Sequence, residues 1–185
     1  LSFFNSNTAL ASIQITSLNQ SNIDKSIQYS FVKDFGSLGI EDGEFNHPQD
    51  IAVDLSNNIY VADTFNHRIQ KFDSNGKFIT KWGSEGTGNG EFYRPTGIDI
   101  DSSGNVYVID KSNFVQKFDS NGNLITKWGS EGTEKGQVNV PNKIAIDPFN
   151  NIYMTSTGSH LGNFVIKFTN NGTFITQLDI GYPTG

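Results

Sequence analysis

The sequence predicts an all-β protein made of three repeats, each a sheet of four short antiparallel strands. Two observations support this fold class. The pairs Phe35-Gly36, Trp82-Gly83 and Trp128-Gly129 align at a period of about 47 residues. Within each repeat, the apolar residues form four short runs that are separated by turn residues. Four strands and a period in the forties together indicate the blade of a β-propeller.

In the first repeat we expect strands at residues 50–53, 59–62, 68–72 and 78–82. The same text returns downstream, as PQDIAVD from Pro48, PTGIDID from Pro95 and PNKIAID from Pro141. The turn between the last two strands contains Asn75-Gly76, residues that tolerate the positive φ of a tight hairpin. Helical repeats of similar period are excluded, because no long apolar run has helical spacing.

Residues 28–185 are therefore assigned to a propeller segment, with blades at about 36–83, 84–129 and 130–178. The segment Gln28 to Phe35 matches only the fourth strand of a repeat, and we expect it to form one additional N-terminal strand. Three blades leave two apolar sides open, whereas propellers close into rings. We therefore expect the chain to be a fragment of a ring that is closed by missing blades or by a second copy.

Residues 1–27 are expected to be a signal-peptide remnant followed by a polar linker. Ala9-Leu10-Ala11 has the small-x-small pattern of a signal-peptidase site. The alternative is a disordered polar terminus that happens to contain two alanines. The first interpretation predicts a secreted or cell-surface protein, and the second leaves a cytoplasmic protein as the alternative.

Composition limits the partners of the protein. The chain of 185 residues has a formal net charge of −6 and a pI near 4.9, so it repels phosphate backbones at neutral pH. We therefore expect no nucleic-acid partner. Because the chain has no cysteine, disulfides and thiolate metal sites are excluded. No apolar segment is long enough to span a membrane.

One longer pattern carries a family resemblance. From Gly43 to Phe72 the chain reads Gly-rich loop, Phe, Pro, Ile-Ala-Val-Asp, Asn-Ile-Tyr-Val-Ala-Asp and Asn-His-Arg-Ile-Gln-Lys-Phe. This order resembles the NHL repeat, whose propellers commonly have six blades. The resemblance implies a scaffold that recognises a protein or an extracellular ligand. The second repeat departs from the pattern by replacing His-Arg-Ile with Phe114-Val115, and the third has Ser156 in place of aspartate.

The variable loops are expected on one face. Because antiparallel strands alternate in direction, the loop before the first strand and the loop between the second and third strands lie on the same side of each blade. Loops on a rigid scaffold usually carry function, so we expect a ligand-binding face there, rich in acidic residues. Its candidate contact residues are Glu44, His47, Phe65, Asn66, His67, Arg68, Tyr93, Arg94, Lys111 and Phe114.

The alternative function is that of a metal-dependent lyase or lactonase, which other propellers resembling NHL proteins perform. Such an enzyme would hold Ca²⁺ or Zn²⁺ with histidines or carboxylates at the central channel. The chain has three histidines, His47, His67 and His160. We assign no catalytic residue, metal ligand or cofactor, so the ligands of such an enzyme would lie largely on missing blades.

Two periodic sets of residues are interpreted as structural. Asp54, Asp101 and Asp147 follow the first strand of each repeat, where aspartates commonly hold turns through backbone hydrogen bonds. Aromatic residues recur at equivalent strand positions, which predicts packing between neighbouring blades. They are Phe35, Phe72, Trp82, Phe118, Trp128 and Phe168.

Overall fold

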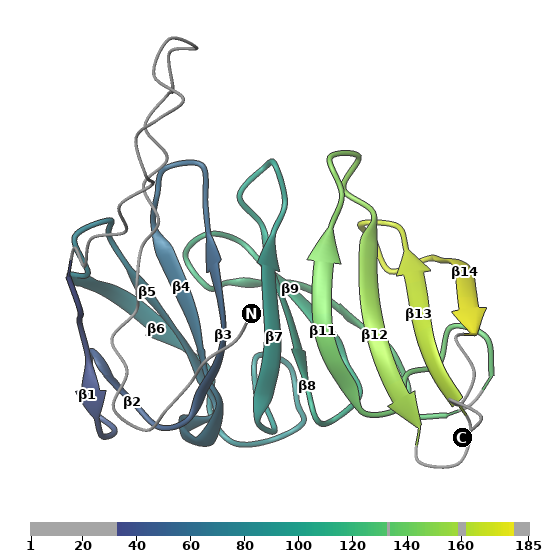
Figure 1. Ribbon diagram of the computed structural model, residues 1–185, viewed down its shortest axis with the longest axis horizontal. Helices are drawn as coiled ribbons and strands as arrows, with labels where there is room; N and C mark the ends of the chain where they lie inside the picture. The colour runs from purple at the N-terminus through teal and green to yellow at the C-terminus, as the bar shows by residue number, and fades with distance from the viewer. Residues whose placement is uncertain (1–32, 133, 159–161, 180–185) are drawn as a thin grey trace, which may run out of the picture.

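The computed structural model describes residues 33–132, 134–158 and 162–179. They form three four-stranded antiparallel sheets, each with its strands in chain order (Figure 1). Blade 1 contains β3 (Pro48–Val53), β4 (Ile59–Asp63), β5 (Arg68–Phe72) and β6 (Phe78–Trp82). Blade 2 contains β7 (Pro95–Ile100), β8 (Val106–Asp110), β9 (Val115–Phe118) and β10 (Leu124–Trp128). Blade 3 contains β11 (Pro141–Ile146), β12 (Ile152–Gly158), β13 (Gly162–Phe168) and β14 (Phe174–Asp179).

The predicted all-β class and the four strands per repeat are confirmed. Two small elements were not predicted. A parallel pair, β1 (Ser37–Leu38) and β2 (Glu44–Phe45), lies in the loop before blade 1, and a 3-10 turn, η1 (Thr64–Asn66), connects β4 to β5. The part of the chain that the structure describes has no α-helix, and so it has no helix long and apolar enough to cross a membrane.

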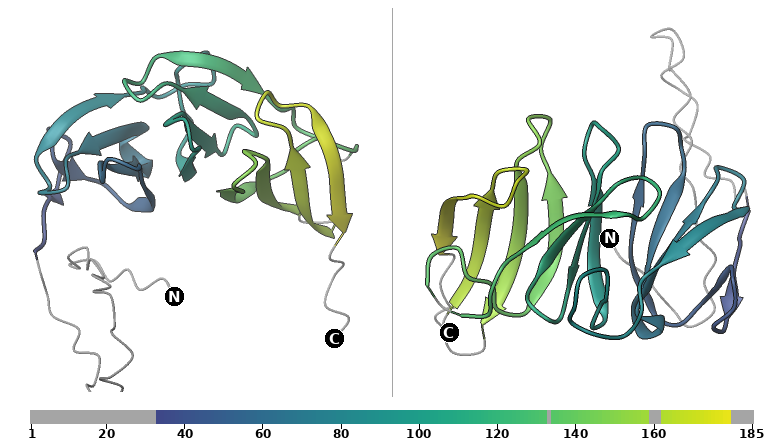
Figure 2. Two further views of the ribbon diagram at one scale, coloured as in Figure 1. Left: turned by 90° about the horizontal axis from the view of Figure 1, so that it is seen from above. Right: turned by 180° about the vertical axis from the view of Figure 1, so that it is seen from behind.

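The three blades stand side by side along a curved arc, with the first strands β3, β7 and β11 on its concave side (Figure 2). The hairpins after these first strands all project from one edge of the arc, at the top of Figure 1. We call this edge the hairpin face. The opposite edge, which we call the loop face, carries residues 37–47, 84–94, 130–132 and 134–140, together with the connections 64–67 and 111–114.

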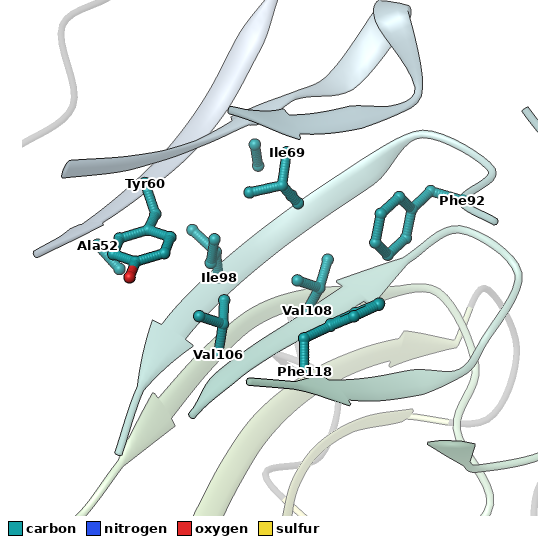
Figure 3. Close-up of a cluster of buried hydrophobic side chains, with 9 residues drawn as sticks. Ala52, Tyr60, Ile69, Phe92, Ile98, Val106, Val108 and Phe118 are labelled. Atoms are coloured by element: carbon teal, nitrogen blue, oxygen red, sulfur yellow. The ribbon is translucent and has the colours of Figure 1, made fainter. Parts of the chain in front are cut away.

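Apolar side chains from facing sheets hold adjacent blades together. The cluster between blades 1 and 2 contains Ala52, Tyr60, Ala62, Ile69, Phe92, Ile98, Val106, Val108 and Phe118 (Figure 3). Alternate residues of β8 point the other way, because Tyr107 and Ile109 pack in the cluster between blades 2 and 3. Both faces of β8 are therefore buried, which explains why residues 106–109 read as a continuous apolar run. Each fully buried side chain of this size contributes roughly 1.5–3 kcal/mol.

The repeated aspartates hold the hairpin face, as predicted. Asp101 Oδ1 accepts hydrogen bonds from the backbone N–H groups of Ser103 and Asn105. Asp101 Oδ2 accepts from Asn105 Nδ2 at 2.8 Å and from the Tyr107 hydroxyl at 3.0 Å. Asp54 and Asp147 make the same set of bonds in the other two blades. One aspartate in each blade thus joins the turn to the second strand.

The predicted aromatic packing between blades is also found. Trp82 packs against the cluster between blades 1 and 2, and Trp128 against the cluster between blades 2 and 3. Each indole also covers a hairpin glycine of the next blade, because Gly122 lies under Trp82 and Gly172 under Trp128. A larger residue at either glycine would collide with the ring.

The N-terminal strand predicted at residues 28–35 lies mostly outside the described residues, as do the signal peptide and linker. Residues 33–36 have no strand pairing. Phe35 nevertheless covers Gly76 as the two tryptophans cover their glycines. It also packs on Phe72, with ring centroids 5.1 Å apart. Phe35 therefore has the position that an outer-strand aromatic of a preceding blade would have.

Among the described residues, no further blade covers either end of the arc. On blade 1, Ile51 is 39% exposed and Val53 is 56% exposed, whereas Ile98, the counterpart of Ile51, is buried between blades 1 and 2. On blade 3, the side facing away from blade 2 has a cavity of about 110 Å³ lined by residues that include Ala145, Tyr153 and Val165. The equivalent surfaces of blades 1 and 2 are each covered by the next blade.

Candidate ligand-binding face

A buried polar network fixes the loop face of blade 1. Arg68 Nε donates to Asp63 Oδ2 at 2.7 Å, and both side chains are buried. The Arg68 guanidinium also donates to the carbonyl oxygens of Ile40, Glu41 and Glu44 in the loop before β3. A buried charged pair that is fully hydrogen-bonded makes its surroundings rigid. Arg68 therefore fixes the loop before β3 and is not itself presented to solvent.

Blade 2 fixes the equivalent loop with a different cation. Phe114 stands where blade 1 has Arg68, so the guanidinium is missing. Lys127 on β10 replaces it, because Lys127 Nζ donates to the carbonyl oxygens of Thr87 at 2.5 Å and Gly88 at 3.2 Å. The same ammonium lies 3.9 Å from the centroid of the Phe114 ring. A cation thus reaches the loop carbonyls in both blades, from β5 in one and from β10 in the other.

An aspartate anchors the start of the connection in both blades. Asp110 Oδ2 accepts the Tyr93 N–H at 2.8 Å, just as Asp63 Oδ1 accepts the Asn46 N–H at 2.7 Å. Burial raises the pKa of Asp110, although hydrogen bonds from Ser112 and the Tyr93 N–H oppose this effect. In blade 3, Ser156 takes the position of the aspartate, and its Oγ accepts the Asn139 N–H at 2.9 Å.

An aromatic and cationic cluster lies on the loop face where blades 1 and 2 meet. The His47 and Phe65 rings stack with centroids 4.4 Å apart. The Arg94 guanidinium carbon lies 5.0 Å from the Phe65 centroid and 5.6 Å from the Tyr93 centroid. The Tyr93 and His67 ring centroids are 6.1 Å apart. We call His47, Phe65, His67, Tyr93 and Arg94 the cation–aromatic cluster.

The cluster is accessible to a partner. Phe65 is 40% exposed and Tyr93 is 41% exposed. His47 is also exposed, whereas Arg94 is half-buried between the two rings. Within the described residues Arg94 forms no ion pair. Exposed aromatics and arginines on a rigid loop are the side chains that most often dominate binding energy in protein interfaces.

Several carboxylates of the loop face are engaged inside it. Asp63 and Asp110 are buried. Glu44 Oε2 accepts the N–H groups of Ile40 and Glu41 in its own loop, and Glu91 accepts the Gly88 N–H in the same way. Asp42 pairs with Lys81 at 2.6 Å. The acidic appearance of this face in the sequence therefore does not extend to the cation–aromatic cluster.

The structure thus divides the predicted contact residues into two groups. His47, Phe65, His67, Tyr93 and Arg94 come together in the cluster. The others lie outside it: Glu44, Asn66 and Arg68 hold the loop before β3, Phe114 lies under Lys127, and Lys111 is exposed on the next connection.

Two residues of this face were not singled out from the sequence. No short-range pattern shows the loop contacts of Lys127, because the residues that it bonds are 39 and 40 positions away in the sequence. Val140 is 48% exposed and precedes Pro141 as His47 precedes Pro48. This shared position before proline was the available signal for Val140.

The carboxylates on the first strands, near the concave side of the arc, make internal bonds. Asp50 pairs with Lys143 at 2.9 Å and accepts the Ile98 N–H at 3.1 Å. Asp99 Oδ2 accepts the Ile146 N–H at 2.7 Å. Burial raises the pKa of Asp99, and the nearby charge of Asp50 adds to this effect. No three histidines or carboxylates of the described residues gather so that they could hold a metal ion.

Comparison with known proteins agrees with this architecture. Residues 15–127 match a family described as a 6-bladed β-propeller. The chain belongs to this family. A solved structure of a protein of unknown function from Bacteroides caccae is similar, with a TM-score of 0.51 at 13% identity, over 72% of this chain and 46% of that one. At this identity the likeness shows the fold alone.

Two curated relatives match a short segment at higher identity. Protein brain tumor of Drosophila melanogaster is 52% identical over 44 residues, which are 24% of this chain and 4% of that protein. The B-box type zinc finger protein ncl-1 of Caenorhabditis elegans is 50% identical over 44 residues, which are 24% of this chain and 5% of that protein. The chain therefore spans only a small part of the length of these relatives.

Proposed function

We propose that this propeller segment is a recognition module that binds a protein through the cation–aromatic cluster. The observation that carries the proposal is the position of Arg94 between the half-exposed rings of Phe65 and Tyr93, with no ion pair among the described residues. The backbone beneath them is fixed by Asp63 and Asp110. A contact surface that is already ordered loses little conformational entropy when a partner binds, so it suits recognition.

Two finer points belong to the same proposal. The repeat is of the NHL type, supported by the text from Gly43 to Phe72, in which Arg68 has the loop-fixing role described above. The protein acts outside the cytoplasm, supported by the pattern Ala9-Leu10-Ala11. N-terminal sequencing of the mature protein from its natural source tests the second point, because cleavage after Ala11 would remove the residues before it.

The binding proposal is tested by affinity capture from the extracellular material of the source, with three forms of the full chain. The first is the wild type. The second carries Phe65→Ser and Tyr93→Ser on the loop face. The third carries Leu55→Ser and Phe149→Ser on the hairpin face, where both side chains are highly exposed, at 87% and 86%. The control therefore removes exposed apolar side chains of comparable size from the opposite face.

We expect a protein that is captured by the wild type and by the hairpin-face variant and is lost with the loop-face variant. Removal of two aromatic contact residues should weaken binding by about 2 kcal/mol or more, since such residues often dominate an interface. Equal capture by all three forms, or loss with the hairpin-face variant alone, would contradict the proposal.

A further inference from the structure

One backbone position is equivalent in all three blades and is unusual in each. His47, Arg94 and Val140 directly precede the proline that opens β3, β7 and β11. Their φ angles are +52°, +57° and +48°, in the left-handed region that residues other than glycine seldom adopt. A following proline favours extended backbone, and a β-branched residue such as Val140 is an outlier at positive φ. Strain of this kind persists where the surrounding structure imposes it, and it is concentrated at binding sites.

In blades 2 and 3 the preceding blade contacts the backbone of this residue. Nδ1 of His67 in blade 1 lies 3.3 Å from the Arg94 N and 3.1 Å from the Phe92 carbonyl oxygen, so it accepts from the first or donates to the second according to its tautomer. The Val140 N–H donates to Oδ1 of Asn113 in blade 2 at 2.9 Å. His67 and Asn113 are themselves equivalent residues at positive φ, +54° and +67°. All three residues thus have one conformation on the loop face, and at the two junctions between blades the preceding blade helps to hold it.

The side chain before the proline differs from blade to blade, whereas much of the surrounding sequence is repeated. Blade 1 presents an imidazole, blade 2 a guanidinium and blade 3 an isopropyl group. His47 and Val140 are exposed, and Arg94 is half-buried against Phe65 and Tyr93. A fixed backbone that carries a different chemical group in each blade is suited to recognising successive side chains of one ligand.

We propose that the residue before each of these prolines is the position at which its blade contacts the bound protein, and that the bound segment places a carboxylate at Arg94 and an apolar side chain at Val140. This proposal rests on the recognition function proposed above. A guanidinium without an ion-pair partner among the described residues offers a fork of donors that matches a carboxylate. Val140, at 48% exposure, offers an apolar surface to a second side chain.

The net charge of the molecule favours a ligand with a single carboxylate over a polyanionic ligand. The net charge is −6, and Glu41, Glu85, Glu131 and Glu134 are exposed or partly exposed in the loops of the same face. A chain of phosphates would meet these carboxylates along with Arg94, and its binding depends on neutralising many charges at once. A protein segment with one acidic residue satisfies Arg94 without that repulsion.

The test is selection of peptides from a random peptide library displayed on phage, with the full chain immobilised. Four forms are compared: wild type, Arg94→Glu, Val140→Lys and Lys77→Glu. Lys77 is exposed on the hairpin face, so the last variant reproduces the charge change of Arg94→Glu away from the loop face. A fifth form, Arg94→Asn, serves as a folding control, because asparagine tolerates positive φ. Thermal melting confirms that each variant is folded before selection.

We expect the wild type and Lys77→Glu to enrich peptides with an acidic residue and an apolar residue at a constant spacing. Arg94→Glu should exchange the acidic preference for a basic one and bind the wild-type peptide on the order of tenfold or more weakly, because like charges then meet. Val140→Lys should change only the apolar position. Enriched peptides whose sequences are the same for all forms would overturn this inference but leave the recognition function standing. If no form enriches any peptide, the recognition function fails and the inference fails with it.

Discussion

The ring of Phe35 lies against the hairpin glycine Gly76, so that a β-carbon added to Gly76 would come within 2.8 Å of ring atoms. Trp82 has the same relationship to Gly122, where the closest approach would be 2.7 Å. Both glycines have positive φ, +76° and +87°. Each hairpin thus needs glycine for two separate reasons, its backbone conformation and the aromatic ring that covers it.

Substitution of these glycines separates the two reasons. Gly104 has a φ of +82°, but a β-carbon there would have no neighbour within 4 Å. We expect Gly104→Ala to lower the free energy of unfolding by about 1 kcal/mol, for backbone strain alone. Gly122→Ala should cost about 1–3 kcal/mol more, because Trp82 must move. Chemical denaturation measures both variants, and equal losses would show that the ring does not press on the hairpin.

The position of Phe35 also bears on how the open ends can be covered. Blade 3 already has its own outer strand, β14, with Leu178 at the position of Trp82. A second copy that packed its blade 1 on blade 3 would bring Leu178 to the place over Gly76 that Phe35 fills. We therefore expect the isolated 185-residue chain to associate through its open apolar sides without forming a defined dimer. Sedimentation over a range of concentrations measures this, and a single dimer mass throughout would contradict it.

Acid should weaken the hairpin face through the repeated aspartates. Burial raises the pKa of Asp101, but hydrogen bonds from Asn105, Tyr107 and Ser103 outweigh it, so the pKa lies below its ordinary value of 3.8. Asp54 and Asp147 are shifted in the same direction. A lowered pKa in the folded state adds stability above the unfolded-state pKa of about 3.9, and this is lost as the pH falls through the folded-state value.

Asp101→Asn tests this contribution. We expect the variant to be less stable at pH 7 by about 1–2 kcal/mol, since the amide cannot accept all four bonds. Its stability should also fall less steeply than that of the wild type below about pH 4. Urea denaturation at several pH values provides both numbers. Parallel curves for the two proteins would mean that Asp101 has an ordinary pKa when folded.

Lys127 should contribute more to the stability of the protein than its counterpart in blade 1. Lys81 occupies the equivalent position but forms an exposed ion pair with Asp42, and such pairs contribute about 0–1 kcal/mol. Lys127 instead donates to the Thr87 and Gly88 carbonyl oxygens. We expect Lys127→Met to destabilise the protein by about 1–2 kcal/mol and Lys81→Met to have little effect. A larger loss for Lys81→Met would show that Lys127 does not replace Arg68.

The strands and hairpins could be predicted because the same text recurs in three repeats, so that turn residues such as Asn75-Gly76 and turn aspartates such as Asp101 are seen in register. Periodicity also assigned Trp82 and Phe118 correctly to packing between blades. These features depend on short-range sequence patterns. They are the features that a single sequence records well.

For the candidate site, the sequence predicted the face of the propeller on which it lies but not the arrangement of its side chains. The sequence places Arg68 and Arg94 on the same face, but it does not show that Arg68 is buried while Arg94 lies between two rings. That difference depends on which loop carbonyls each guanidinium reaches. The conformation of Val140 ran against its local sequence, because a valine before proline favours extended backbone. Contacts between segments that are far apart in the sequence decide these features.

Hydrogen–deuterium exchange of the full chain, with and without a peptide selected on the wild type, tests most directly whether the loop face of blades 1 and 2 is the binding surface. We expect the peptide to slow exchange at residues 64–67 and 91–94, beside the cation–aromatic cluster, and to leave the hairpins at 73–77 and 119–123 unchanged. Slower exchange at those hairpins, with no change around Phe65 and Arg94, would contradict the account.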